Sequence, residues 1–176
     1  MSREVNLNTE HKSNTPAEIK DCWQTPKFVF DYYDRRFNFD MDVAASWSNA
    51  FIPHNHLGEQ FSGLFLDALT ESEWGKFNWC NPPYSNIMPW VTKAVDEMNR
   101  GSVTVMLIPS DTSVKWFKKA FENCTECHFI SGRLSFINAD TQKSVAGNNK
   151  GSVVFIFDPK SPVKKSVHLI DRDSMK

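Results

Sequence analysis

Phe77-Asn78-Trp79-Cys80-Asn81-Pro82-Pro83-Tyr84 is a short apolar run that stops abruptly at two consecutive prolines. Proline has no backbone N–H and fixes φ near about −65°, so a strand that ends here leaves its last carbonyl groups without ladder partners. In an open α/β sheet, ligands bind at the carboxyl ends of the strands. The sequence therefore predicts that Asn81, Pro82 and Tyr84 line a crevice at the sheet edge.

These residue types suit chemistry on an aromatic amine. The lone pair of such an amine is delocalised into its ring, which makes the nitrogen a poor nucleophile. The side-chain oxygen of Asn81 and the backbone oxygen of Pro82 can each accept a hydrogen bond from one N–H of the amine. These two hydrogen bonds favour a tetrahedral, nucleophilic nitrogen. Tyr84 offers a flat face on which a base can stack, a contact typically worth about 1–3 kcal/mol.

Four segments in this order resemble the small phage DNA N-6-adenine methyltransferases of the Dam-like family. They are DCWQTP at 21–26, DMDVAAS at 40–46, NPPY at 81–84 and GRLSF at 132–136. The NPPY tetrapeptide alone is less specific, because enzymes that methylate a protein glutamine amide carry it too. The resemblance implies an α/β fold with the Rossmann-like sheet of S-adenosylmethionine-dependent methyltransferases. Such a sheet is mostly parallel, with an antiparallel C-terminal edge strand and helices on both faces.

The resemblance also implies roles for individual residues. The catalytic residues would be Asn81, Pro82, Pro83 and Tyr84. The cofactor would be S-adenosylmethionine, and the residues implied to bind it are Gln24, Thr25, Pro26, Asp42, Ala44 and Asp67. Asp42, at the end of the predicted first strand, would accept from the ammonium group, and Asp67 from the adenine amine. Glu59 is a candidate for the ribose.

Each of these assignments has a structural alternative. Thr25 and Pro26 are good residues for the N-cap and first position of a helix over about 28–37, which needs no ligand. A helix N-terminus also presents free N–H groups to an anion such as the cofactor carboxylate. The glycine-rich turn of other methyltransferases is replaced here by Ala44-Ala45-Ser46. An aspartate that simply faces solvent at a strand end is the alternative for Asp42.

Contacts to the substrate are predicted in the second half of the chain. Arg133 follows a glycine beside the implied target pocket, where it would hold a phosphate, orient the substrate or form a structural salt bridge. Phe136 would pack against an extruded base or in the core. Residues 138–151 form a polar segment with Asn148 and Lys150, which suits either the recognition of base edges or a plain surface loop.

The remaining elements follow from apolar periodicity. Helices are predicted over 89–100 and 114–121, and strands over 103–109, 127–130 and 153–157. Residues 21–160 are expected to form one methyltransferase domain, preceded by a flexible polar arm over 1–20 and followed by a polar tail over 161–176. A chain of 176 residues is long enough for one well-buried core.

Composition limits the possible partners and locations. The net charge of −1 gives no general attraction to nucleic acid, so binding to double-stranded DNA would depend on a local basic patch. No apolar run approaches the roughly 20 residues of a membrane helix, and no signal peptide is recognisable. We therefore expect a cytoplasmic protein, in the host cell if phage-encoded, with no membrane and no obligate protein partner.

The stretch Cys124-Thr125-Glu126-Cys127-His128 matches the C-x-x-C-H pattern of covalent haem attachment. That chemistry requires export and a second axial ligand, and neither is indicated. Cysteine is also a common small buried residue between a helix and a strand, which is the interpretation we favour. No metal is predicted at the reaction site.

Together these features predict methyl transfer from S-adenosylmethionine to the N6 amine of adenine in DNA, with the base flipped out of the duplex. Three alternatives remain at this point: an RNA adenine, a protein glutamine, or a non-catalytic DNA-binding relative. Both DNA protection and regulation are compatible with the sequence.

Overall fold

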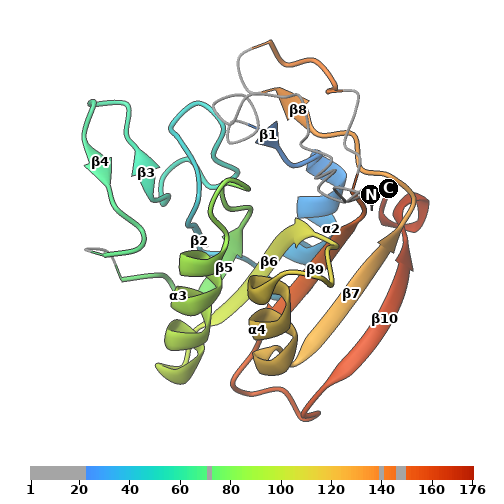
Figure 1. Ribbon diagram of the computed structural model, residues 1–176. Helices are drawn as coiled ribbons and strands as arrows, with labels where there is room; N and C mark the ends of the chain where they lie inside the picture. The colour runs from blue at the N-terminus through green and yellow to red at the C-terminus, as the bar shows by residue number, and fades with distance from the viewer. Residues whose placement is uncertain (1–22, 71–72, 139–140, 146–149) are drawn as a thin grey trace, which may run out of the picture.

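The computed structural model describes residues 23–70, 73–138, 141–145 and 150–176. Its centre is a six-stranded sheet with the strand order β10-β7-β9-β6-β5-β2 (Figure 1). The strands are β2 (Met41–Asp42), β5 (Phe77–Cys80), β6 (Val103–Pro109), β7 (Glu126–Ser131), β9 (Ser152–Phe157) and β10 (Ser166–Asp171). β9 runs antiparallel to β6 and β7, and the other neighbouring strands pair in parallel. The sheet is therefore mostly parallel, as predicted.

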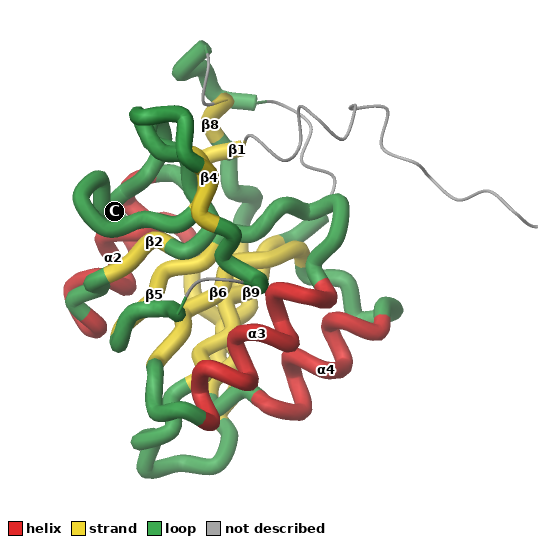
Figure 2. The backbone as a smooth tube through the Cα atoms, turned by 90° about the vertical axis from the view of Figure 1, so that its left-hand side faces the viewer, coloured by secondary structure: helices red, strands yellow, loops and turns green. Residues whose placement is uncertain are grey.

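Helices cover both faces of the sheet, which confirms that part of the prediction. On one face, α3 (Met88–Asn99) and α4 (Lys115–Asn123) bury Val91, Ala94, Phe117 and Ala120 against the strands. On the other face lies α2 (Lys27–Phe37), which buries Val29, Phe30, Tyr33 and Phe37. Figure 2 shows the sheet edge-on between α2 and the α3–α4 pair.

The central strands form where apolar residues run without interruption. Residues 103–108 of β6 are all buried, and so are all six residues of β9. A strand that is covered on both faces needs such a continuous run. α2 ends at Asn38, which adopts the left-handed conformation at φ 50° and donates its backbone N–H to the Asp34 carbonyl at 2.8 Å. This end of the helix turns the chain into β2.

Two expectations about the C-terminal part are wrong. The antiparallel strand β9 lies inside the sheet, between β6 and β7, and the edge strand is β10, which is parallel to β7. β10 and the 3₁₀ helix η1 (Arg172–Met175) occupy residues predicted to form a polar tail. The outer face of β10 is open and carries exposed apolar side chains: Val167 is 54% exposed and Leu169 is 74% exposed.

Two small antiparallel ribbons lie beyond the main sheet. β1 (Trp23–Gln24) pairs with β8 (Ile137–Asn138), and β3 (Gly58–Glu59) pairs with β4 (Phe65–Leu66). Figure 1 shows both ribbons above the upper end of the sheet as drawn. Within the described ranges, no helix is both long and apolar enough to cross a membrane.

Candidate active site

The Asn-Pro-Pro-Tyr segment leaves the carboxyl end of β5, next to the ends of β2 and β6. The side-chain amide of Asn81 donates to the backbone carbonyl of Trp23 at 3.0 Å. That bond fixes the orientation of the amide group. The Asn81 side-chain oxygen is buried and accepts no hydrogen bond from the described residues. In the same part of the chain, no backbone N–H donates to the Pro82 carbonyl oxygen. Two acceptors at the strand end therefore receive no hydrogen bond from the residues that the structure describes.

Three aromatic rings support this turn. The Tyr84 ring meets the edge of the Phe136 ring, with centroids 6.0 Å apart and planes at 88°. The Trp23 ring stacks on the Phe136 ring, with centroids 5.9 Å apart and planes at 23°. Phe136 is only 1% exposed, so it packs in the core and not on the surface. Of the two alternatives for Phe136, the structure shows core packing directly behind Tyr84.

The hydroxyl of Tyr84 is a buried polar group. Burial, with a smaller contribution from Cys80, raises the pKa of Tyr84, so the side chain is a neutral phenol. The oxygen has no hydrogen-bond partner among the described residues. An unpaired buried hydroxyl costs free energy, so its presence indicates either a ligand contact or a purely steric role for the ring.

A narrow crevice lies beside Asn81, and a larger hollow adjoins this crevice. The crevice, of about 20 Å³, is lined by Trp23, Thr25, Asp42 and Asn81 among others. The larger hollow, of about 560 Å³, opens between the end of β2 and the β3–β4 ribbon. Ala44, Ala45 and Asn49 line both. The larger volume falls within the roughly 300–1,000 Å³ typical of small-molecule sites.

The segment before α2 forms one wall of the crevice. Gln24 donates through its side-chain amide to the Asn49 carbonyl at 3.1 Å, which ties β1 to the turn after β2. The prediction that Thr25 is the N-cap is wrong, because α2 begins at Lys27 and Pro26 occupies the cap position without a side-chain bond. The Thr25 hydroxyl is instead buried and lacks a partner among the described residues.

Asp42 ends β2 at the floor of the crevice. It is buried, and its carboxylate accepts the backbone N–H of Phe51 at 3.0 Å. Burial raises the pKa of Asp42 to about 6, although hydrogen bonds from Phe51 and Ala44 oppose this. The alternative of a solvated strand-end aspartate is therefore wrong for Asp42. A positively charged ligand in the crevice would stabilise the ionised form.

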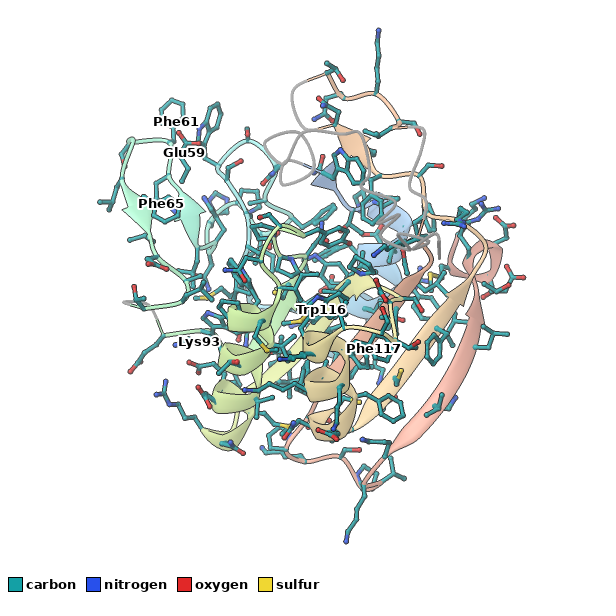
Figure 3. The ribbon with its side chains drawn as sticks, in the orientation of Figure 1. Glu59, Phe61, Phe65, Lys93, Trp116 and Phe117 are labelled. Atoms are coloured by element: carbon teal, nitrogen blue, oxygen red, sulfur yellow. The ribbon has the colours of Figure 1, made fainter. Side chains whose placement is uncertain are left out.

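Asp67 and Glu59 both line the larger hollow. Asp67 also caps its own turn, accepting from the Leu69 backbone at 2.8 Å and the Thr70 hydroxyl at 2.7 Å. Those bonds, the Thr70 hydroxyl first, lower the pKa of Asp67. Glu59 is exposed on β3, and Figure 3 shows it on the projecting ribbon together with Phe65. Pro83 lines the same hollow, so the turn after β5 contributes to both cavities.

The predicted substrate residues are not part of these hollows. Arg133 follows β7 and lines a separate hollow of about 160 Å³ with Phe28, Arg172 and Lys176. Lys150 is paired with Asp111 at 2.5 Å, and this contact lowers the Asp111 pKa to about 2. Asn148 lies outside the described residues.

The Cys-x-x-Cys-His stretch does not converge on one ligand. Cys124 and Cys127 are buried in the core under α4, and burial raises their pKa values to about 11 and about 12. His128 follows Cys127 in β7 and points to the opposite face, where it contacts Tyr33 on α2. This arrangement agrees with a structural role for both cysteines.

A family comparison adds an independent finding. The family model for DNA N-6-adenine-methyltransferase (Dam) matches residues 12–176. The chain belongs to the Dam family. This confirms the resemblance inferred from the four segments, and it places the chain among adenine-specific DNA methyltransferases, a class that requires a methyl donor.

Two phage proteins of the same description are similar to this Dam-family chain. A DNA N-6-adenine-methyltransferase of Escherichia phage T1 is 37% identical over 163 residues, which cover 82% of this chain and 66% of the T1 protein. A protein of the same name from Haemophilus phage HP1 is 37% identical over 155 residues, which cover 86% of each. This chain therefore spans about two-thirds of the length of the T1 protein.

Several residues around the site were not predicted. Trp23 was quoted only within its motif, yet its carbonyl orients Asn81 from 58 residues away. Asn49 links the crevice to the larger hollow and holds Gln24. Phe65 lines the larger hollow although it is 66% exposed. No local sequence pattern marked Trp23, Asn49 or Phe65 as part of the site.

Proposed function

We propose that this Dam-family protein transfers a methyl group from S-adenosylmethionine to the N6 amine of adenine in DNA. The observation that carries the proposal is the pair of acceptors at the end of β5. The Asn81 amide is oriented by the Trp23 carbonyl, so its oxygen is left to accept an N–H from a ligand. The Pro82 carbonyl is the second acceptor, and the next residue, Pro83, lines a hollow large enough for a nucleoside.

The residues present fit the cofactor. In the crevice, the buried Asp42 carboxylate suits the ammonium group, while the Thr25 hydroxyl and the first N–H groups of α2 suit the carboxylate. In the larger hollow, Glu59 suits the ribose hydroxyls and Asp67 the adenine amine. The sheet order β2-β5-β6 with its carboxyl ends at these hollows supports a Rossmann-like methyltransferase fold.

The protein residues then prepare the amine for attack. Bound S-adenosylmethionine supplies an electrophilic methyl group on a sulfonium. The Asn81 side-chain oxygen and the Pro82 carbonyl oxygen accept hydrogen bonds from the two N6–H groups. These bonds localise the nitrogen lone pair, which then points toward the methyl group. Tyr84 stacks on the base and is itself backed by Phe136. As the new N–C bond forms, the C–S bond breaks, and N6 releases one proton to solvent.

Access for the base requires movement at the β1–β8 ribbon. The crevice beside Asn81 holds about 20 Å³, far less than an adenine ring needs. β1 covers Asn81 through the Trp23 carbonyl, and β8 pairs with β1. Flipping the base costs a few kcal/mol in such enzymes, and stacking on Tyr84 offsets part of it.

The decisive test replaces Asn81. The Asn81→Ala variant should lose at least about 100-fold in the rate of methyl transfer, the typical effect of removing a preorganised polar contact at a reacting centre. Binding of S-adenosylmethionine, measured by calorimetry, should remain close to that of the wild type. Asn99→Ala, at the exposed end of α3, is the matched control and should change neither quantity.

Tritiated S-adenosylmethionine offered with DNA, RNA or protein identifies the acceptor. We expect label in DNA, in adenine N6. Label in RNA or in protein glutamine alone would overturn the proposed substrate. Full activity of Asn81→Ala would contradict the proposed role of the amide, and no detectable binding of S-adenosylmethionine would indicate a non-catalytic relative.

A further inference from the structure

Glu126, His128 and His168 bring their side chains together at the edge of the sheet, away from Asn81. Glu126 and His128 are alternate residues of β7 and so share one face. His168 pairs directly with His128 in the ladder between β7 and β10. Figure 1 shows these two strands side by side. One ligand atom from each of the three residues lies within 4.8 Å of the other two. The cluster sits toward the amino ends of the strands, at the opposite edge from the site after β5.

Two of the three side chains are already held in place. His128 Nε2 lies 3.1 Å from a Glu126 carboxylate oxygen, and its Nδ1 lies 3.1 Å from the Tyr33 hydroxyl. The Arg36 guanidinium donates hydrogen bonds to both carboxylate oxygens of Glu126, at 2.8 Å and 2.5 Å. Glu126 and His128 are buried, so these contacts give them one orientation. The His168 ring stands edge-on to His128, with centroids 5.1 Å apart.

We propose that Glu126, His128 and His168 bind one divalent transition-metal ion of the zinc type. Two imidazoles and one carboxylate form a known three-ligand set for zinc, which leaves a fourth position for water. Ligand atoms in a tetrahedral zinc site are roughly 3.3 Å apart, since each lies about 2.0–2.1 Å from the metal. His128 and Glu126 already meet this spacing. The ligand atom of the exposed His168 side chain lies within 4.8 Å of the other two, so this ring must move closer to complete the site.

The surrounding contacts suit this role. With Nε2 bound to the metal, the single imidazole proton of His128 lies on Nδ1, which donates to the Tyr33 oxygen 3.1 Å away. Such a second contact is a regular feature of metal-binding histidines. Arg36 hydrogen-bonds to the Glu126 carboxylate and orients it.

The predicted consequence is that the metal joins the edge strand to the body of the sheet. β10 is covered poorly on its outer face, and its ladder with β7 is the main contact that holds it. An ion bound by residues of both strands stabilises only the paired state, so binding adds to the stability of the folded chain. The proposed methyl transfer does not require this ion.

Zinc binding by the full chain, without an affinity tag and with a non-chelating reductant, tests the proposal. Equilibrium dialysis with Zn²⁺ alone should show one ion per wild-type chain, and Zn²⁺ should raise the melting temperature. His168→Ala should weaken binding at least about tenfold and remove the thermal shift. This substitution is on the surface and leaves the buried Glu126–His128 pair intact.

The matched control is His54→Ala, which removes an exposed histidine outside the cluster and should bind Zn²⁺ like the wild type. No bound zinc in the wild type would overturn the proposal. Equal zinc binding by the wild type and His168→Ala would overturn it as well, because the ion would then occupy another site. Neither result depends on methyl transfer, so failure here is distinct from failure of the proposed function.

Discussion

A buried carboxylate whose charge is only partly compensated lowers the stability of the folded chain, and Asp42 is such a group. In the unfolded chain Asp42 titrates near 3.8, whereas burial raises its folded pKa to about 6. The folded state then binds the proton more tightly, so stability falls as pH rises from about 4 to about 6 and stays lowered above that. A shift of this size corresponds to about 3 kcal/mol, as an order of magnitude.

Asp42→Asn should therefore stabilise the protein at pH 8 by roughly 1–3 kcal/mol in urea unfolding. The amide oxygen can still accept from Phe51, but no charge is buried. The same variant should bind S-adenosylmethionine at least about tenfold more weakly, since the proposed partner of the ammonium group is lost. Asp96→Asn, on the exposed side of α3, should change neither measurement. Tight cofactor binding by Asp42→Asn would contradict the ammonium contact.

Thr25 shows why a single residue can be assigned wrongly from sequence. Thr followed by Pro is a strong helix-start pattern, and local sequence offers no reason to reject it. The structure starts the helix one residue later, after Trp23 and Gln24 have paired with Ile137 and Asn138. That pairing depends on residues more than a hundred positions away. It also explains how the Thr25 hydroxyl comes to lie buried beside the crevice.

The edge strand β10 and the following η1 are integral to the fold. β10 pairs with β7 along all six residues, and Met175 is buried against the α2 side of the sheet. Deletion of residues 160–176 should therefore lower the free energy of unfolding by several kcal/mol, because a ladder and a buried methionine are lost together. Urea unfolding monitored by tryptophan fluorescence measures the loss.

Two single substitutions separate packing from chain length. Met175→Ala should cost about 2–5 kcal/mol, the usual range for emptying a buried methionine site. Leu169→Thr, on the exposed face of β10, should stay within about 0.5 kcal/mol of the wild type. Unchanged stability after the deletion would restore the interpretation of this region as a tail.

Elements with strong local signals were predicted well from sequence, and strand order was not. β5 was predicted from the two prolines that follow it. β6 and β9 were predicted from continuous apolar runs, and α3 from apolar residues at helical spacing. Sequence gives no comparable signal for the insertion of β9 between β6 and β7. That arrangement results from the pairing of distant segments, and a fully buried strand reads the same at either place in the order.

In the candidate site, too, residues with a local sequence signal were placed correctly, whereas the relative positions of distant residues were not predicted. Asn81, Pro82 and Tyr84 were placed at a strand end by a local rule about proline, and the structure has them there. Arg133 was grouped with them by resemblance and Lys150 by the polar composition of its segment, and the structure places Arg133 in a separate hollow and Lys150 in an ion pair with Asp111. Their roles toward DNA remain predictions. The distance between such groups is a property of the tertiary structure that spacing along the chain does not encode.

At the scale of the whole molecule, the proposed methyl-transfer site and two of the predicted DNA contacts lie at one edge of the sheet. The carboxyl ends of β2, β5, β6, β7 and β10 lie at the same edge because these strands run in one direction. Asn81, Lys150 and Arg133 therefore share an edge despite their separate hollows. The opposite edge carries the turn after β9, with Lys160. Since the net charge is −1, this local distribution of cations and not the total charge must attract DNA.

That distribution makes a prediction about salt. Arg133 lines its hollow with Arg172 and Lys176, although Asp173 pairs with the latter two. If this hollow holds one phosphate through Arg133, Arg133→Gln should reduce the slope of log K against log salt concentration by about 0.9 and weaken all DNA sequences alike. Fluorescence anisotropy of a labelled duplex over a salt series measures the slope. Lys160→Gln removes the same charge from the opposite edge and should leave the slope unchanged. Equal slopes for the wild type and Arg133→Gln would assign DNA binding to another part of the edge, because a lost phosphate contact releases one counterion fewer whatever its effect on folding.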